Sequence, residues 1–148
     1  MRLDHVLSGI RLSSPLSLEL AGQPIRSIKY DSRRVKQGDL FFAFSGATVD
    51  GRKFAGPALA QGAVAVVSEL PPPPDFSPDL AGRWLRVEHA RRAMALAARH
   101  LYAATLQRIR VTGITGTNGK TTTSHLVDSV LRRAGFVTAL IGTIEYHM

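Results

Sequence analysis

The 148-residue chain contains no cysteine, so disulfide bonds, thiolate metal sites and cysteine nucleophiles are excluded. It also lacks an uninterrupted apolar run of the roughly 18 residues that a membrane-spanning helix needs. The N-terminal residues Met1-Arg2-Leu3-Asp4 carry an early acid and do not resemble a secretory signal. We therefore expect a cytoplasmic protein with no membrane partner.

Acidic residues are scarce compared with basic ones, 11 against 19, and the formal net charge is +8. Such a surplus is typical of nucleic-acid-binding proteins. The arginines, however, are scattered in short pairs without interleaved aromatic residues, as at Arg33-Arg34, Arg91-Arg92 and Arg132-Arg133. We expect no nucleic-acid partner, because basic character also suits a protein whose ligands carry several phosphates. A nucleic-acid-binding protein with an incidental glycine loop remains an alternative.

The hydrophobic content of 45% is enough for an ordinary globular core. Apolar runs and alternating patterns predict strands at 25–30, 40–44, 63–67 and 84–87. Helices are predicted at 3–10, 54–61 and 89–104, and a proline-rich, exposed connector runs from Pro71 to Gly82. These elements predict a small mixed α/β domain over residues 1–107.

Residues 113–123 read Gly-Ile-Thr-Gly-Thr-Asn-Gly-Lys-Thr-Thr-Thr and lie between a strand-like segment, 109–115, and a helix-like segment, 119–134. Glycines allow successive backbone N–H groups to point into one concavity, and a helix N-terminus adds partial positive charge. Lys120 supplies a cation for phosphates, and Thr121 a hydroxyl for Mg²⁺. This order predicts a phosphate cradle that binds ATP with Mg²⁺.

The helix after this loop is expected to bury one apolar face, made of Leu126, Val127, Val130, Leu131 and Ala134. A further strand is predicted at 137–144, so residues 108–148 would form one βαβ unit. Parallel sheets need layers on both faces, and one unit leaves its apolar surfaces uncovered. We therefore expect the chain to be a fragment, truncated inside its ATP-binding domain.

The glycine spacing differs from the strict P-loop, which requires glycine where this chain has Ile114. The Gly-x-x-Gly-Thr-Asn-Gly-Lys-Thr-Thr form resembles the ATP loop of the Mur ligases and their folylpolyglutamate synthetase relatives. A second series resembles the N-terminal substrate domain of the Mur ligases that add the third amino acid to the peptidoglycan precursor. Its residues are Asp31-Ser32-Arg33, Gly38-Asp39-Leu40-Phe41-Phe42-Ala43, Gly46 and Asp50-Gly51.

The resemblance implies a UDP-sugar-binding domain over 1–107, followed by the first βαβ unit of a Mur-type P-loop ATP-binding domain over 108–148. Tyr30 and Ser32 match positions that contact the UDP-sugar, and Ala47, Thr48 and Val49 match a further UDP-binding loop. The implied ATP-binding residues are Gly116, Thr117, Asn118, Gly119, Lys120, Thr121 and Thr122. Lys120 and Thr121 would be catalytic, with Thr121 holding Mg²⁺. Taken alone, Asp31-Ser32-Arg33 is typical of an Asx turn with a salt bridge.

The implied activity is ATP-dependent amide formation through an acyl phosphate. The substrates would be UDP-N-acetylmuramoyl-L-alanyl-D-glutamate and a diamino acid, either meso-diaminopimelate or lysine, and the enzyme would be a monomer. The part of the family that selects the diamino acid lies beyond residue 148, and we expect these 148 residues to be inactive by themselves. The alternatives are a UDP-sugar-binding module without chemistry and a neighbouring Mur ligase.

Overall fold

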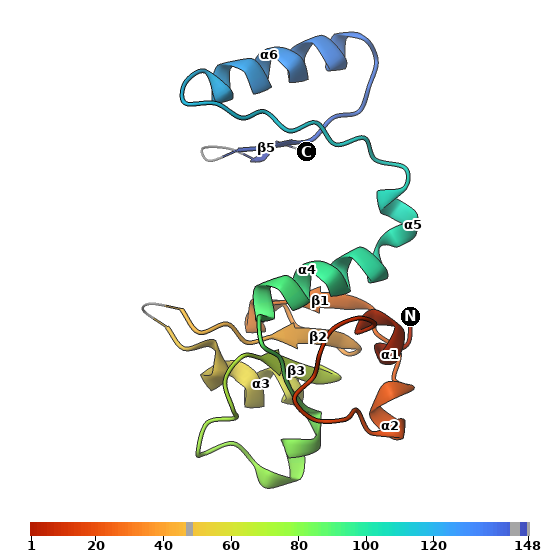
Figure 1. The fold of residues 1–148 in the computed structure, drawn as a ribbon, viewed down its shortest axis with the longest axis vertical. Coiled ribbons are helices and arrows are strands. Elements are labelled where there is room, and N and C mark those ends of the chain that lie inside the picture. Colours follow the sequence, from red (N-terminus) through yellow and green to blue (C-terminus); the bar gives the residue numbers. More distant parts are fainter. Residues whose placement is uncertain (47–48, 143–145, 148) are drawn as a thin grey trace. The chain divides into compact units, whose positions relative to one another are not determined.

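The computed structural model describes residues 1–46, 49–142 and 146–147. The chain separates into two units, Met1–Arg108 and Ile109–Met148, which are drawn in Figure 1 and are described one at a time. The division falls one residue after the domain boundary that the sequence predicts.

The first unit is built on a parallel sheet of four strands that pair in the order in which they occur in the chain, β1-β2-β3-β4. The register places Ile28 beside Leu40, Phe41 beside Val66, and Val67 beside Leu85. The strands are β1 (Ser27–Lys29), β2 (Asp39–Phe42), β3 (Ala65–Ser68) and β4 (Trp84–Arg86).

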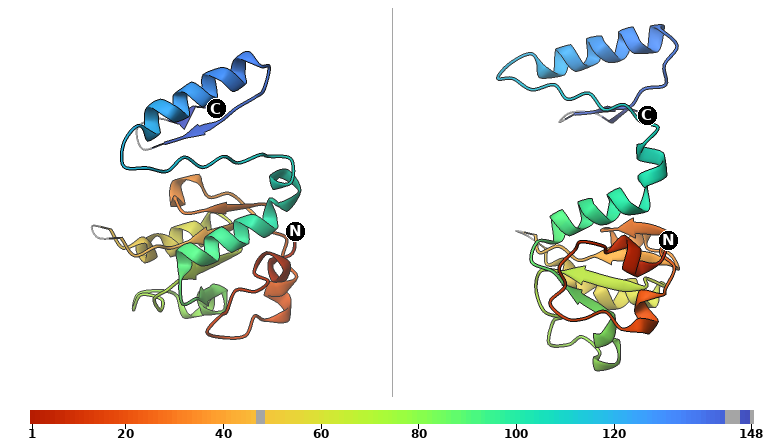
Figure 2. Two further views of the ribbon diagram at one scale, coloured as in Figure 1. Left: turned by 45° about the horizontal axis from the view of Figure 1, so that its top comes forward. Right: turned by 45° about the vertical axis from the view of Figure 1, so that its right-hand side comes forward.

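Helices cover both faces of this sheet, and Figures 1 and 2 show α3 and α4 on opposite sides. One face packs against α1, which precedes the sheet in the chain, and α4, which follows it. The other face packs against the segments that connect successive strands. The helices are α1 (Leu3–Val6), α2 (Leu18–Ala21), α3 (Ala55–Ala60), α4 (Ala90–Leu101) and α5 (Ala103–Leu106), with 3₁₀ helices η1 (Ser32–Arg34), η2 (Gly51–Phe54) and η3 (Pro78–Arg83).

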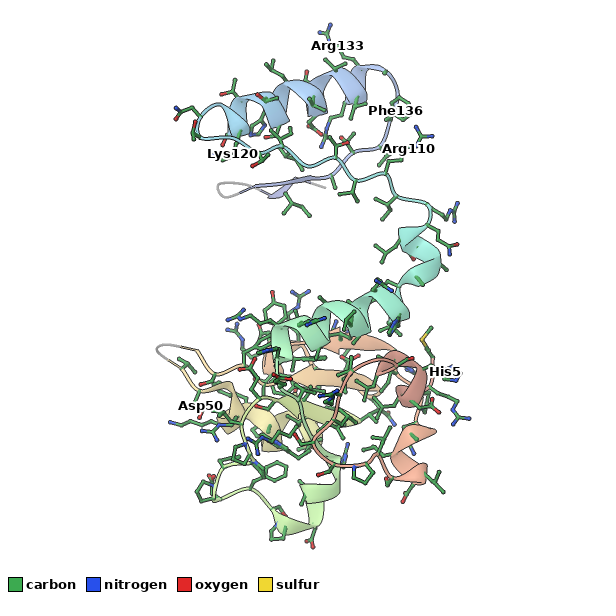
Figure 3. The ribbon with its side chains drawn as sticks, in the orientation of Figure 1. His5, Asp50, Arg110, Lys120, Arg133 and Phe136 are labelled. Atoms are coloured by element: carbon green, nitrogen blue, oxygen red, sulfur yellow. The ribbon has the colours of Figure 1, made fainter. Side chains whose placement is uncertain are left out.

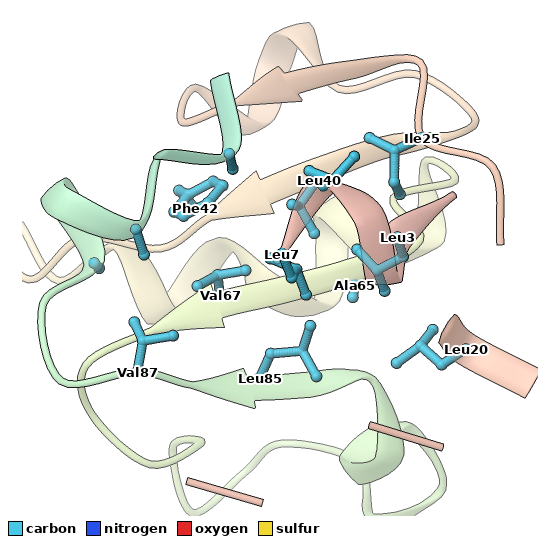
Figure 4. Packing of buried hydrophobic residues seen from close by; sticks show 14 residues of the cluster. Leu3, Leu7, Leu20, Ile25, Leu40, Phe42, Ala65, Val67, Leu85 and Val87 are labelled. Carbon is cyan, nitrogen blue, oxygen red and sulfur yellow. The ribbon is translucent and has the colours of Figure 1, made fainter. Parts of the chain in front are cut away.

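Side chains alternate between two buried clusters along the central strands. Leu40 and Phe42 lie in the cluster under α1 and α4, which Figure 4 shows, whereas Phe41 and Ala43 lie in the cluster on the α3 side. Every residue of β2 and β3 is buried. The continuous apolar runs in the sequence are therefore strands buried on both faces, as predicted, and the mixed α/β class is confirmed.

The proline-rich connector is not simply an exposed polyproline loop. It ends in the 3₁₀ helix η3, and the Phe76 ring stands edge-on to Trp84 with ring centroids 5.1 Å apart. The Trp84 indole Nε1 donates to the Leu70 carbonyl oxygen over 3.1 Å. A buried indole needs both apolar packing and a hydrogen-bond acceptor, and the connector supplies both to Trp84 of β4. The connector therefore packs against the sheet at β4.

The second unit contains the helix α6 (Lys120–Arg133) and an antiparallel pair, β5 (Leu140–Ile141) and β6 (Tyr146–His147). The strand expected at 109–115 is not formed, and the strand expected at 137–144 is limited to β5, with residues 143–145 outside the described residues. The predicted parallel βαβ unit is therefore absent from the described part of the chain. Residues 109–115 have no neighbouring strand there, and a strand without a partner leaves its ladder groups unpaired.

The apolar face of α6 is also exposed, which corrects the expectation that it is buried. Leu126 and Val130 expose 63% and 66% of their surface, and Val127, Leu131 and Ala134 are exposed as well. The amphipathic pattern predicts the face correctly, but the short β5–β6 pair, which contacts α6, leaves these side chains exposed. In the described part of the chain, no helix is long and apolar enough to cross a membrane.

Candidate functional site

The loop before α6 depends on glycine backbone conformations. Gly119 is the N-cap of α6 and has φ of +76°, and Gly116 has φ of +152°. A Cβ atom added at Gly119 would meet nothing within 4 Å, so it is the backbone conformation and not space that favours glycine there. The sequence predicted this local geometry from its glycine spacing.

The N-terminus of α6 is open. No side chain caps it, and the N–H of Thr123 is the one that bonds back to the Gly119 carbonyl, over 2.9 Å. The backbone N–H groups of residues 120–122 therefore lack an intrahelical acceptor, and α6 contributes partial positive charge at the same end. This end of the 14-residue helix suits an anion, and the residues present fit a nucleotide phosphate.

Lys120 lies across this loop, as Figure 3 shows. Its Nζ donates to the Gly116 carbonyl oxygen over 2.6 Å and to the Thr117 carbonyl oxygen over 3.4 Å. The exposed ammonium is thus held above the glycines by neutral acceptors and not by a carboxylate. The remaining predicted residues, Thr117, Asn118, Thr121 and Thr122, are exposed around the same turn.

Asp128 connects α6 with the segment that leads to β5. Thr138 Oγ1 donates to Asp128 Oδ1 over 2.6 Å, and Arg132 Nε donates to Asp128 Oδ2 over 2.9 Å. The hydrogen bond from Thr138, together with the bond and charge of Arg132, holds the pKa of the Asp128 carboxyl below its usual value. The sequence suggests a surface position without a catalytic role, and the structure gives this residue a positioning contact.

The second set of candidate residues lies at the carboxyl edge of the first unit's sheet. Tyr30 directly follows β1 and exposes 67% of its surface, and Ser32 opens η1. Val49 is exposed in the loop after β2, whereas Ala47 and Thr48 lie outside the described residues. Ligands of open parallel sheets bind outside the carboxyl ends of the strands, so this edge is the expected place for a substrate.

Two Asp-x-Arg turns with one geometry frame this edge. Asp31 accepts the Arg33 backbone N–H over 3.1 Å and pairs with its guanidinium at 2.8 Å. Asp50 likewise accepts the Arg52 backbone N–H over 3.0 Å and pairs with the Arg52 guanidinium at 2.7 Å. The Arg52 guanidinium also donates to the Pro71 carbonyl oxygen. In each turn the hydrogen bond from the arginine side chain lowers the pKa of the aspartate.

The expected Asx turn with a salt bridge at Asp31-Ser32-Arg33 is therefore present. In this turn the Asp31 carboxylate and the Arg33 guanidinium are paired with each other. Within the described residues the Ser32 hydroxyl makes no hydrogen bond, so it is available to a ligand at this edge. The turn and the proposed substrate contact are compatible.

Sequence reasoning missed an aromatic and cationic group beside these residues. The Phe44 ring lies 6.5 Å from the Tyr30 ring, and the Arg91 guanidinium carbon lies 5.0 Å from the Phe44 ring centroid. The sequence pattern alone places Arg91 on the solvent-exposed face of a helix. Its contact with Phe44 joins residues distant in the chain, so helical spacing alone could not reveal it. No group of His, Cys, Asp and Glu suited to a metal is found among the described residues.

Comparison with known proteins decides the family. The description "Mur ligase family, catalytic domain" matches residues 24–102, and "Mur ligase middle domain" matches residues 114–148. The chain belongs to the Mur ligase family. These two matches cover the sheet of the first unit and the glycine loop with α6, respectively.

Relatives of this Mur ligase chain are named UDP-N-acetylmuramoyl-L-alanyl-D-glutamate–2,6-diaminopimelate ligase. The one from Solibacter usitatus is 58% identical over 148 residues, which are 100% of this chain and 29% of the relative. The one from Bacillus cereus is 46% identical over 121 residues, 82% of this chain and 23% of the relative. The chain thus spans less than a third of the length of these relatives.

Solved structures agree with these matches. A structure of a ligase with the same name superposes with a TM-score of 0.67 at 27% identity, covering 99% of this chain and 29% of the other. The MurF ligase from Thermotoga maritima in complex with ADP gives a TM-score of 0.54 at 32% identity, covering 73% of this chain and 23% of that one.

Proposed function

We propose that this chain provides the UDP-sugar-binding domain and the ATP phosphate loop of a ligase in peptidoglycan synthesis. The ligase joins a diamino acid to UDP-N-acetylmuramoyl-L-alanyl-D-glutamate at the expense of ATP. The names of the relatives favour 2,6-diaminopimelate over lysine as the diamino acid. The cytoplasm and a monomeric state remain our predictions for such an enzyme.

The observation that carries this proposal is the loop geometry at the N-terminus of α6. Gly116 and Gly119 adopt positive φ values, the first helical amides are open, and Lys120 lies over the turn. A triphosphate placed there would meet backbone donors and a mobile cation that exchanges its carbonyl contacts for phosphate oxygens. The Thr121 hydroxyl would be the ligand for Mg²⁺. The ADP complex of the related MurF ligase supports a nucleotide in this family.

The substrate side of the proposal rests on the carboxyl edge of the first unit. Ser32 presents a hydroxyl without a protein partner among the described residues, and Tyr30 presents an exposed ring. The backbone of the loop containing Ala47, Thr48 and Val49 would complete the contacts to the UDP group. A hydroxyl can donate to a phosphate oxygen or accept from a uracil N–H.

When bound, ATP would supply the phosphoryl group that activates the substrate carboxylate. The amine of the diamino acid would then attack the carbonyl carbon, and inorganic phosphate would leave as the amide bond forms. Within this chain, Lys120 neutralises phosphate charge, and the amides of residues 120–122 hold the phosphates in position. Because phosphoryl transfer depends mainly on positioning and charge stabilisation, these groups should affect turnover far more than folding.

A chimera tests the proposal. Residues 1–148 replace the matching 148 residues of the Solibacter usitatus ligase, and ligation of diaminopimelate to the UDP-dipeptide is measured. We expect an active chimera, and the Lys120→Ala version should lose about 10²-fold or more in kcat, the scale of one lost electrostatic contact at a transferring group. Ser129→Ala, an exposed change on the same helix, is the control.

Unchanged turnover by the Lys120→Ala chimera would contradict the assignment of the ATP loop. A chimera that binds UDP but neither binds ATP nor turns over would instead favour a UDP-sugar-binding module without chemistry. Replacement of diaminopimelate by lysine in the same assay tests the choice of the diamino acid.

A further inference from the structure

We propose that Arg91, stacked on Phe44, contacts the diphosphate of the UDP group at the carboxyl edge of the sheet. This inference rests on the proposed function and adds a residue that determines affinity for the charged part of the substrate. Neither the glycine loop nor the Asp-x-Arg turns include this arginine.

Phe44 places the arginine at the correct edge. The residue lies two positions after β2 and packs partly on the cluster under α4, so its ring belongs to the α4 face of the sheet. Its neighbours are Phe42, with ring centroids 6.3 Å apart, and Tyr30, at 6.5 Å. Phe44 is thus the aromatic link between the buried core and the exposed Tyr30.

The guanidinium of Arg91 is oriented but not neutralised. Its carbon lies 5.0 Å from the Phe44 ring centroid, a distance at which the ring quadrupole attracts a cation. Within the described residues, no carboxylate lies at ion-pair distance from it. A cation–π contact uses the face of the guanidinium and leaves the N–H groups at its edge free to donate to phosphate oxygens.

Acidic groups of the first unit at this edge of the sheet and next to α4 already have partners. Asp31 and Asp50 pair with Arg33 and Arg52 in their own turns. Glu69 accepts the Ala90 backbone N–H over 2.8 Å, and Glu88 lies 3.7 Å from His89. These contacts leave the positive charge of Arg91 available for an anionic ligand.

Both sides of the Arg91–Phe44 contact are anchored. The Gly51 N–H donates to the Phe44 carbonyl oxygen over 2.9 Å, which fixes the backbone that carries the ring. The carboxylate of Glu69 holds the first amide of α4, one residue before Arg91. Because the guanidinium is held before a ligand arrives, less side-chain entropy is lost on binding.

Isothermal titration of the 148-residue chain with uridine, UMP and UDP tests this inference. We expect Arg91→Gln to weaken UDP binding about tenfold, the ratio that one charge-assisted hydrogen bond provides, and to leave uridine binding within about twofold. Arg91→Lys should recover part of the UDP affinity, since it keeps the charge but not the planar stacking. Arg92→Gln, the neighbouring exposed arginine, is the matched control and should change neither ligand.

The outcomes separate this inference from the proposed function. Tight UDP binding by Arg91→Gln, equal to that of the unmodified chain, overturns the role of Arg91 and leaves the UDP site in place. An equal loss of uridine and UDP also overturns it, because it means a structural role. If the unmodified chain binds neither UDP nor uridine, the proposed substrate function fails together with the inference.

Discussion

The two units of this chain are stabilised in different ways. Met1–Arg108 buries two hydrophobic clusters on the two faces of a four-stranded sheet. In Ile109–Met148, none of the residues whose burial is described is buried. The first unit is thus held by contacts between distant residues. The second is held by the hydrogen bonds of α6, by the β5–β6 pair and by the contact between Asp128 and Thr138.

This difference coincides with a difference in chemistry. The proposed UDP-binding edge has its backbone placed by a buried sheet, whereas the proposed phosphate loop lies in a unit with little burial of its own. Segments with few buried apolar contacts open at a lower free energy than a packed core. Within these 148 residues we therefore expect the substrate edge to be preorganised by its own core. The burial around the ATP loop is that of a chain that spans 29% of a 58%-identical relative.

The largest effect is expected from the core of the first unit. Phe42→Ala removes a fully buried ring and should lower the free energy of unfolding by about 3–5 kcal/mol. Trp84, the single tryptophan, lies in this unit, so its fluorescence during urea denaturation reports the change. Leu126→Ala on the exposed face of α6 is the control and should leave this transition in place. A shift of similar size with Leu126→Ala would contradict the assignment of this transition to the core of the first unit.

A smaller effect is expected where a loop passes close to β2. A Cβ atom at Gly51 would lie 2.5 Å from the Phe44 carbonyl oxygen, so Gly51→Ala should destabilise the first unit by about 1–3 kcal/mol. Gly56, in α3, has nothing within 4 Å of an added Cβ atom. Gly56→Ala should therefore stabilise the unit by about 0.5–1 kcal/mol through helix propensity. The same fluorescence assay measures both, and effects of equal sign would refute the steric argument.

The smallest effect is expected in the second unit, and it depends on pH. The pKa of Asp128 is lowered in the folded chain, so its contribution is present above the ordinary value of 3.8 and is lost as the pH falls through the folded pKa. The Cα chemical shifts of residues 124–134 should move toward coil values as the pH falls below 3.8. Asp128→Asn should reduce this change. A pH response as large in Asp128→Asn as in the unmodified chain would show that another group is responsible.

The fold of the first unit is largely predictable from the sequence because its strands are buried on both faces. The continuous apolar runs around Leu40 and Val66 are typical of a central strand that is buried on both faces. The second unit is less predictable for the same physical reason. The apolar residues of 109–115 and of α6 have strong patterns, but a pattern becomes a strand or a buried face only where a partner surface is present.

The candidate site also has parts that the sequence predicts and parts that it does not. The spacing of Gly116, Gly119 and Lys120 is local, so the sequence predicts the turn and the helix N-terminus directly. The contact of Arg91 with Phe44 joins segments far apart in the chain. Gly135 marks the turn that ends α6, but residue spacing does not show that Thr138 then reaches Asp128. Such contacts follow from the fold and are not visible in residue spacing.

The sequential order of the strands has a consequence for synthesis on the ribosome. Each strand pairs with the strand made just before it, so the sheet can grow at one edge as the chain emerges from its N-terminus. The face under Leu40 and Phe42 is different, because α4 is made after all four strands. That apolar face stays partly uncovered until translation passes Leu101, which makes this interval the one in which the nascent chain is most prone to aggregate.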